Sequence, residues 1–304
     1  MNKSQRFFVC AAVLILAAAL AYTQEKPVDR ATVPFSNPSR PGLVKTNVYN
    51  GSITVTGYEG SEVVVEARIR EIELAGVERE SREAVREAVR ESMRTRERVQ
   101  TESSETGEDK RKGLKRIPVA SSGLTIEEEN NVMSISTSSF KHAVDLTIKV
   151  PVRTSLQLKA YNNGDITVEN VRGELEVTNH NGAVKLDRIS GVVLAHTYNG
   201  PVDVTLLELE PNKPMSFSTW NGDIDVTLPA STKASFKMRS DRADIYSDFN
   251  VNLSATPKET KEPEKKEGKY QIAFGKFVYG NVNGGGPEFT FQTYNGDIYI
   301  RKGK

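Results

Sequence analysis

The sequence predicts an all-β chain in which coils of 18–22 residues stack in a β-solenoid-like arrangement. The first observation is an aromatic-Asn-Gly triplet that recurs before short runs of alternating apolar and polar residues. The second is a fixed interval of nine residues between Gly164, Gly173, Gly182, Gly191 and Gly200. Only alternate glycines of this series follow Asn, so the true period is 18 residues and contains two strands and two turns. A fixed period of about 20 residues is typical of repeat architectures.

Each repeat carries its own signals for a strand and a turn. Segments such as Ile166-Thr167-Val168 alternate apolar and β-branched polar residues, which is typical of half-buried strands. Asn-Gly supplies the turn because both residues tolerate positive φ. The copies begin at Tyr49, Tyr161 (one place further from its Asn-Gly), His180, Tyr198, Trp220 and Tyr294, and a degenerate copy lies at 241–246.

Two architectures fit this repeat. In stacked coils, equivalent residues of neighbouring repeats form columns. In an antiparallel meander, every Asn-Gly would close a hairpin. The alternation of two turn types favours the coils, because a plain meander gives no reason for an 18-residue period.

The first residues have the pattern of a secretory signal. Lys3 and Arg6 precede a continuous apolar run, which ends near an Ala-x-Ala-like cleavage site at 19–21. We therefore expect a signal peptide at 1–21 and an exported chain, located in the periplasm, in the cell envelope or outside the cell. The alternative is an uncleaved N-terminal anchor, because the run is near the lower length limit for a membrane span. Residues 22–42 are expected to be an extended lead-in to a β-repeat domain at 43–304.

Two charged stretches interrupt this domain. The first, at 76–116, begins with a helical pattern in which Val85, Val89 and Met93 form a thin apolar stripe beside rows of Arg and Glu, and it ends in a polar linker. The arginine row either meets an acidic partner or the envelope surface, or is a solvated face balanced by the glutamates. The second stretch, at 255–269, is rich in Lys, Glu and Pro, and it predicts a surface loop.

Further strands are expected on either side of the repeats. We expect them at 63–69, 124–127, 132–137 and 144–150, with Asn130-Asn131 joining the second to the third and Pro151 ending the fourth. After the second charged stretch, a final strand pair is expected at 270–278 and 288–300, with a tight connection at 283–287.

Composition excludes several classes of function. The chain has 41 Lys and Arg against 40 Asp and Glu, and without Lys3 and Arg6 the balance is 39 against 40. Nucleic-acid binding needs a concentrated basic excess, so no nucleic-acid partner is expected. The single cysteine, Cys10, lies in the leader, which leaves none for a disulfide, a zinc site or a nucleophile in the exported chain. No small-molecule cofactor is expected.

Several motifs together resemble one bacterial family. The repeated Asn-Gly-Asp-Ile units, the Thr-Leu-Pro-Ala run at 227–230 and the glycine-rich run at 280–286 are similar to the putative-adhesin domain family of exported proteins. The resemblance covers residues 40–304 apart from the charged insert. It implies an all-β, solenoid-like fold and no known reaction. Ala183 and Pro201 depart from the family pattern, because they replace the Asp after Asn-Gly.

Carboxylates at the turns have two possible roles. Asp165, Asp223 and Asp297 follow Asn-Gly, where they either bind calcium or accept backbone hydrogen bonds. The Gly-Gly-x-Gly-x-Asp repeat of calcium-binding rolls is absent from the sequence, so no metal site is predicted. No marked carboxylate pair and no Gly-x-Ser-x-Gly motif indicate catalysis, so we expect no catalytic residues and no enzyme, with a glycan-acting enzyme as the weakest alternative.

The sharpest candidate for a binding site is a column of aromatic side chains. Stacked coils would place Tyr161, His180, Tyr198, Trp220 and Tyr294 at equivalent positions, about 4.8 Å apart from strand to strand. Such rings either contact an envelope glycan or a surface protein, or cover one another and close the edge of the core. We therefore expect an adhesion or surface-interaction module. The alternative is a structural or stress-related periplasmic protein without a dedicated ligand.

Overall fold

The structure is a computed structural model that describes residues 28–70, 122–137, 142–254, 264–266, 269–271 and 277–303. The predicted signal peptide, the charged insert at 76–116 and most of the loop at 255–269 lie outside these residues. Every regular element in the described part is a β-strand, which confirms the all-β prediction. The search of this part for a helix able to cross a membrane finds none.

The strands follow the predicted alternation of buried and exposed positions closely, as in β2, β3, β8 and β13. Their bounds are β1 Val28–Pro34, β2 Gly42–Asn50, β3 Ile53–Tyr58, β4 Glu62–Arg70, β5 Leu124–Glu129, β6 Val132–Thr137, β7 Ala143–Pro151, β8 Thr154–Asn162, β9 Ile166–Glu169, β10 Arg172–Asn181, β11 Val184–Asn199, β12 Val202–Leu209, β13 Met215–Asn221, β14 Ile224–Leu228, β15 Ala234–Ser240, β16 Ile245–Ser247, β17 Asn252–Leu253, β18 Glu264–Lys266, β19 Lys269–Gln271, β20 Val278–Val282, β21 Glu288–Thr293 and β22 Ile298–Lys302.

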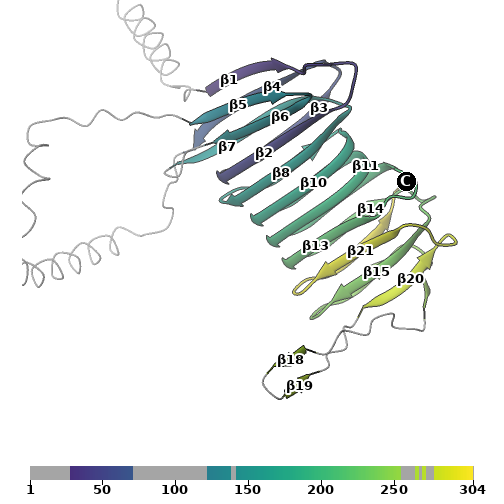
Figure 1. The fold of residues 1–304 in the computed structure, drawn as a ribbon. Helices are drawn as coiled ribbons and strands as arrows, with labels where there is room; N and C mark the ends of the chain where they lie inside the picture. Colours follow the sequence, from purple (N-terminus) through teal and green to yellow (C-terminus); the bar gives the residue numbers. More distant parts are fainter. Residues whose placement is uncertain are drawn as a thin grey trace, which may run out of the picture. The chain divides into compact units, whose positions relative to one another are not determined.

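Twenty of these strands form one mixed sheet with two ladders of neighbouring strands. The first ladder runs β5-β6-β2-β8-β10-β11-β13-β21-β15-β20-β17, and Figure 1 shows most of its strands side by side. The second runs β1-β4-β7-β3-β9-β11-β12-β14-β22-β16. Strand β11 belongs to both ladders, because its first half pairs with β9 and β12 and its second half pairs with β10 and β13.

Pairing within the repeat region is parallel and follows the 18-residue period. Gly173 pairs with Gly191, and Val184 pairs with Val202. The Asn-Gly turns therefore carry the chain from one ladder to the other and do not close hairpins, so the meander alternative is wrong for this region. Antiparallel pairs occur towards the ends of the ladders, including β5 with β6, where Asn130 and Asn131 adopt positive φ at the predicted turn.

We call each pair of strands joined by an Asn-Gly turn or its equivalent, one strand in each ladder, a coil. The order of the coils in space differs from their order in the sequence. Strands β2 and β3 lie between β6–β7 and β8–β9, and β21 and β22 lie between β13–β14 and β15–β16. The prediction of a final strand pair is therefore wrong, because β15 separates β20 from β21. Part of the predicted loop at 255–269 also takes part in a short hairpin of β18 and β19.

The core is filled by the inward-facing residues of the two ladders. Aliphatic side chains such as Ile53, Leu158 and Val184 are fully buried in its central part. Towards the C-terminal coils the core becomes aromatic, and Phe217 stacks on Phe291 with ring centroids 5.3 Å apart. This burial removes apolar area from water along the length of both ladders, and it is the main source of stability for such a fold.

Candidate functional site

Six rings form an aromatic strip along one border of the first ladder, next to the Asn-Gly turns. Its members are Tyr49 of β2, Tyr161 of β8, His180 of β10, Tyr198 of β11, Trp220 of β13 and Tyr294 after β21. All five residues predicted for the strip lie in it. Tyr49 also belongs to the strip, because β2 lies beside β8. The order of the repeats in the sequence did not indicate this neighbour.

Four successive rings of the strip, from His180 to Tyr294, stack on one another. Ring centroids are 5.1 Å apart for His180 and Tyr198, 5.9 Å for Tyr198 and Trp220, and 4.5 Å for Trp220 and Tyr294, with interplanar angles of 11°, 3° and 13°. Tyr49 and Tyr161 are tilted by 33° at 6.1 Å. Four rings of the strip, Tyr49, Tyr161, Tyr198 and Trp220, nevertheless stay 40–46% exposed.

This stacking decides which part of each ring meets solvent. The faces of the central rings are turned towards their neighbours, so a ligand approaching the strip meets ring edges and their polar atoms. The edge of an aromatic ring is its electropositive part, and the tyrosine hydroxyl and the indole N–H are hydrogen-bond donors. At one end, the guanidinium of Arg242 lies 4.8 Å from the centroid of Tyr294 and donates to its hydroxyl oxygen (3.1 Å). The strip therefore suits hydrogen-bonding partners better than partners that stack face to face.

A row of asparagines supports the strip from the adjoining turn position. The side-chain amide of each member donates to the amide oxygen of the preceding coil, at 3.0 Å for Asn181 to Asn162, 2.8 Å for Asn199 to Asn181, 2.8 Å for Asn221 to Asn199 and 2.6 Å for Asn295 to Asn221. These hydrogen bonds run along the ladder and join the turn position of each coil to that of its neighbour.

The aspartates of the turns cap backbone amides of the next coil. Asp165 accepts from the N–H of Ala183 (2.8 Å), Asp223 from that of Asp297 (2.9 Å), and Asp297 from that of Asp244 (2.9 Å). These contacts agree with the interpretation that the carboxylates accept backbone hydrogen bonds. The donating N–H groups belong to the next coil. Within the described residues, no group of three or more His, Cys, Asp or Glu side chains is placed to hold a metal ion.

His196 lies beside the strip, which its isolated position in the sequence did not indicate. Its Nδ1 is 2.8 Å from Ser218 Oγ, in a hydrogen bond whose direction depends on the tautomer of the imidazole. Partial burial, and then the nearby His180, lower the pKa of His196. The signal that could have placed it is the repeat itself, because aligning Tyr198 with Trp220 also aligns His196 with Ser218.

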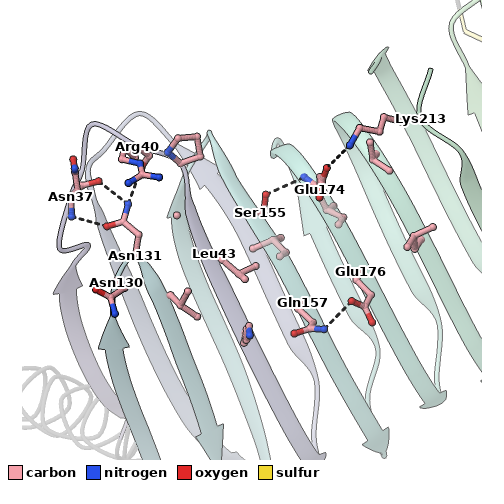
Figure 2. A pocket seen from close by; sticks show the side chains of 18 of the residues that line it. Asn37, Arg40, Leu43, Asn130, Asn131, Ser155, Gln157, Glu174, Glu176 and Lys213 are labelled. Carbon is pink, nitrogen blue, oxygen red and sulfur yellow. Dashed lines mark hydrogen bonds and ion pairs between the residues drawn. The ribbon is translucent and has the colours of Figure 1, made fainter. Parts of the chain in front are cut away.

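The same ladder carries a groove of about 920 Å³ on its outer face, shown in Figure 2. Its floor is formed by outward side chains of β2, β8, β10 and β11, and one wall is the segment 36–41 with the turn at 130–131. The wall is anchored: Ser36 Oγ donates to Glu128 (2.6 Å), and the N–H of Asn37 donates to Asn131 Oδ1 (2.6 Å). Hydrogen bonds from Ser36 lower the pKa of Glu128. Sequence reasoning missed this groove, because its parts come from distant segments.

Comparison with known proteins identifies the family. Residues 120–274, just over half of the chain, match the family described as Toastrack DUF4097. The chain belongs to this family. The match confirms the family resemblance stated from the motifs. The repeat units of the Toastrack chain extend beyond the matched residues on both sides, at Tyr49 and at Tyr294.

Two solved structures resemble this Toastrack chain at low sequence identity. A putative cell adhesion protein from Clostridium sporogenes matches at 11% identity with a TM-score of 0.47, covering 91% of this chain and 100% of the other. A putative adhesin from Bacteroides fragilis matches at 8% identity with a TM-score of 0.28, covering 91% of this chain and 98% of the other. The search of curated proteins finds no match.

Proposed function

We propose that this Toastrack chain is an exported, non-enzymatic protein of the cell envelope that acts as an adhesion or surface-interaction module. The observation that carries the proposal is the aromatic strip, a row of exposed rings on a rigid support. Monomeric proteins seldom expose several large aromatic side chains side by side unless the surface has a partner. The partner is an envelope glycan or a surface protein that hydrogen-bonds to the ring edges.

We further propose that the coils form a solenoid-like stack, since parallel pairing at the repeat period supports that arrangement. In such a stack, the strip lengthens with each added repeat, and weak contacts at each ring add up along an extended partner. The proposed export rests on the signal-like pattern at 1–21.

One observation favours a second candidate function. The rings of the strip pack on each other, as they would if their role were only to close the edge of the core. The chain would then be a structural or stress-related periplasmic protein without a dedicated ligand.

A pull-down from envelope material with residues 22–304, analysed for glycan and for protein, separates the two candidates. The interaction module predicts a specific ligand whose capture is lost with Trp220→Ala. The matched control is Tyr246→Ala, which removes a half-exposed ring from a stacked pair on the second ladder (5.3 Å to Tyr299) and should leave capture unchanged. No specific capture would favour the structural candidate. Specific capture that is equal for the wild type and both variants would show that the ligand binds outside the strip, and it would overturn the strip as the binding surface.

A further inference from the structure

The chain contains seven Asn-Gly pairs, and all of them lie among the residues that the structure describes. They are Asn50-Gly51, Asn163-Gly164, Asn181-Gly182, Asn199-Gly200, Asn221-Gly222, Asn283-Gly284 and Asn295-Gly296. Asparagine followed by glycine is prone to deamidation, because glycine has no side chain to hinder attack by its backbone nitrogen on the asparagine amide. The local sequence therefore makes all seven pairs candidates for this modification, and their surroundings decide which of them reacts.

Deamidation has two requirements in a folded protein. The glycine N–H loses its proton to hydroxide, and the nitrogen forms a bond to Cγ of the preceding asparagine. The side-chain nitrogen takes a proton from water and leaves as ammonia, and water then opens the succinimide ring to aspartate or isoaspartate. The glycine N–H must therefore be free of a hydrogen-bond acceptor, and the peptide between the two residues must be able to rotate towards the asparagine side chain.

Four of the pairs do not meet the first requirement. Their glycine N–H groups donate to carbonyl oxygens of the neighbouring coil: Gly51 to Asn162 (2.9 Å), Gly182 to Asn199, Gly200 to Asn221 and Gly222 to Asn295 (2.8 Å each). Each attacking nitrogen is thus held in the hydrogen bonding between coils, and it becomes available only when the stack opens locally.

Two further pairs do not meet the second requirement. The N–H groups of Gly164 and Gly296 have no acceptor among the described residues. A Cβ built on Gly164, however, would lie 2.3 Å from the carbonyl carbon of Gly51, and one built on Gly296 would lie 2.0 Å from the carbonyl oxygen of Gly222. Both backbones therefore lie directly against the neighbouring coil, and neither peptide can rotate unless the coils separate.

The turn between β20 and β21 meets both requirements at Asn283-Gly284. The N–H of Gly284 has no acceptor among the described residues, and nothing lies within 4 Å of a Cβ built on it, apart from its chain neighbours. Asn283 and Gly284 are both exposed, and two more glycines follow them. A run of glycines gives the backbone wide conformational freedom, so the peptide can rotate here without disturbing the coils.

The side chain of Asn283 joins this turn to the segment between β14 and β15. Its Nδ2 donates to the carbonyl oxygens of Thr232 (2.8 Å) and Ala230 (3.3 Å). These bonds hold the amide, but neither of them involves the attacking nitrogen of Gly284. Deamidation would replace the donor by a carboxylate oxygen, which would face two carbonyl oxygens without a hydrogen to share. Both hydrogen bonds would therefore be lost.

We propose that Asn283-Gly284 is the deamidation site of the folded chain, with solvent water as the reactant. Formation of aspartate or isoaspartate there releases the turn between β20 and β21 from the segment at 229–233. The other six Asn-Gly pairs do not react while the coils stay stacked. The proposal does not depend on the function proposed for the aromatic strip.

Incubation of residues 22–304 at mildly alkaline pH, followed by peptide mapping with mass spectrometry, tests the assignment. Conversion of amide to carboxyl should be about tenfold or more faster at Asn283 than at the other six pairs, because those react only through local opening. In urea, where the coils are unfolded, the seven rates should converge. Another pair that reacts as fast as Asn283 in the folded chain would overturn the proposal, and so would the same ranking of rates in urea.

Gly284→Ala tests the attacking group. The added Cβ meets no other part of the chain, so it hinders the attack without a packing clash. Most of the conversion at Asn283 should be lost in this variant. Conversion at the wild-type rate would overturn attack by the nitrogen of residue 284.

Asn283→Asp reproduces the aspartate product and tests the release of the turn. It should lower Tm by about 2–6 °C, because two hydrogen bonds are lost. Asn212→Asp is the matched control. Asn212 is also exposed with positive φ, and its side chain forms no hydrogen bond among the described residues. Its replacement should leave Tm unchanged, and equal values of Tm for the two variants would overturn the proposed release.

Discussion

Gly200 illustrates how single residues set the spacing between coils. Its φ is +151°, and a Cβ at this position would lie 2.2 Å from the carbonyl oxygen of Gly182 in the coil beneath. Gly182 approaches Gly164 in the same way, so the glycine of each Asn-Gly turn allows the backbone of the next turn to come close. Gly182, Gly191 and Gly200 are therefore required by packing as well as by backbone conformation.

Gly200→Ala should lower the free energy of unfolding by about 3 kcal/mol or more, because backbone strain and a backbone clash add together. Gly284→Ala is the control, since its φ of +92° is strained but nothing lies within 4 Å of the added Cβ. It should cost about 1–2 kcal/mol. Urea denaturation measures both, and equal losses would show that the close approach to Gly182 is unimportant.

The ionised carboxylate of Asp203 destabilises the folded chain at neutral pH. Partial burial, and then the charge of Asp225 on the neighbouring strand, raise its pKa above the ordinary value of 3.8. The folded-state pKa is thus higher than the unfolded one. The stabilising contribution of the protonated carboxyl is complete below pH 3.8, and it is lost as the pH rises through the folded-state pKa.

Asp203→Asn should therefore raise Tm at pH 7, by about 1–2 °C because the group is partly solvated. The gain should disappear towards pH 3. Asp187→Asn is the control variant, because Asp187 forms an ion pair with Arg188. Removing this ion pair should not stabilise the chain. Calorimetric scans across this pH range measure the effect, and an unchanged or lower Tm for Asp203→Asn at pH 7 would contradict it.

At the scale of the element, each strand end contributes one ring to the strip and one amide to the asparagine row. The ring of Trp220 lies between those of Tyr198 and Tyr294, and the amide of Asn221 bonds to coils on both sides. Neighbouring strands are thereby coupled through side chains as well as through backbone pairing. The stacked rings and the asparagine row therefore add contacts between strands that already pair through their backbones.

A double-mutant cycle on Tyr198→Ala and Trp220→Ala should give a coupling of about 0.5–1.5 kcal/mol in the free energy of unfolding, because the two rings are stacked. The control cycle pairs Trp220→Ala with Tyr161→Ala, three strands away, and its coupling should be within about 0.5 kcal/mol of zero. Additive losses in the first cycle would mean that the rings do not stabilise one another.

At the scale of the whole molecule, the chain inserts its last coil between two coils made earlier. Strands β21 and β22 bring Phe289, Phe291, Ile298 and Ile300 into the core, all nearly or fully buried. They separate β13 and β14 from β15 and β16, whose pairing partners they provide. The C-terminal segment therefore supplies core residues between strands that precede it in the sequence.

Ending the chain at residue 276 should prevent the C-terminal coils from folding. The five lost core residues, these four and Val282, represent roughly 10 kcal/mol of apolar burial, at about 2 kcal/mol each. Near-ultraviolet circular dichroism and limited proteolysis would show the loss. Deleting 257–263, from the stretch predicted to be a surface loop, is the control and should preserve the fold. A truncated chain with native proteolytic resistance up to residue 247 would contradict the prediction.

The sequence alone determined the strands, the turns and the aromatic position, because alternation, Asn-Gly and the 18-residue period are local properties that act within each repeat. It also predicted five of the six rings of the strip. It could not determine which coil lies beside which, because units with equivalent turns and registers are nearly interchangeable as neighbours. That choice rests on core packing between distant segments, such as Phe217 against Phe291. Only the tertiary structure therefore added Tyr49 to the strip, placed His196 beside Ser218 and formed the groove on the first ladder from segments far apart in the chain.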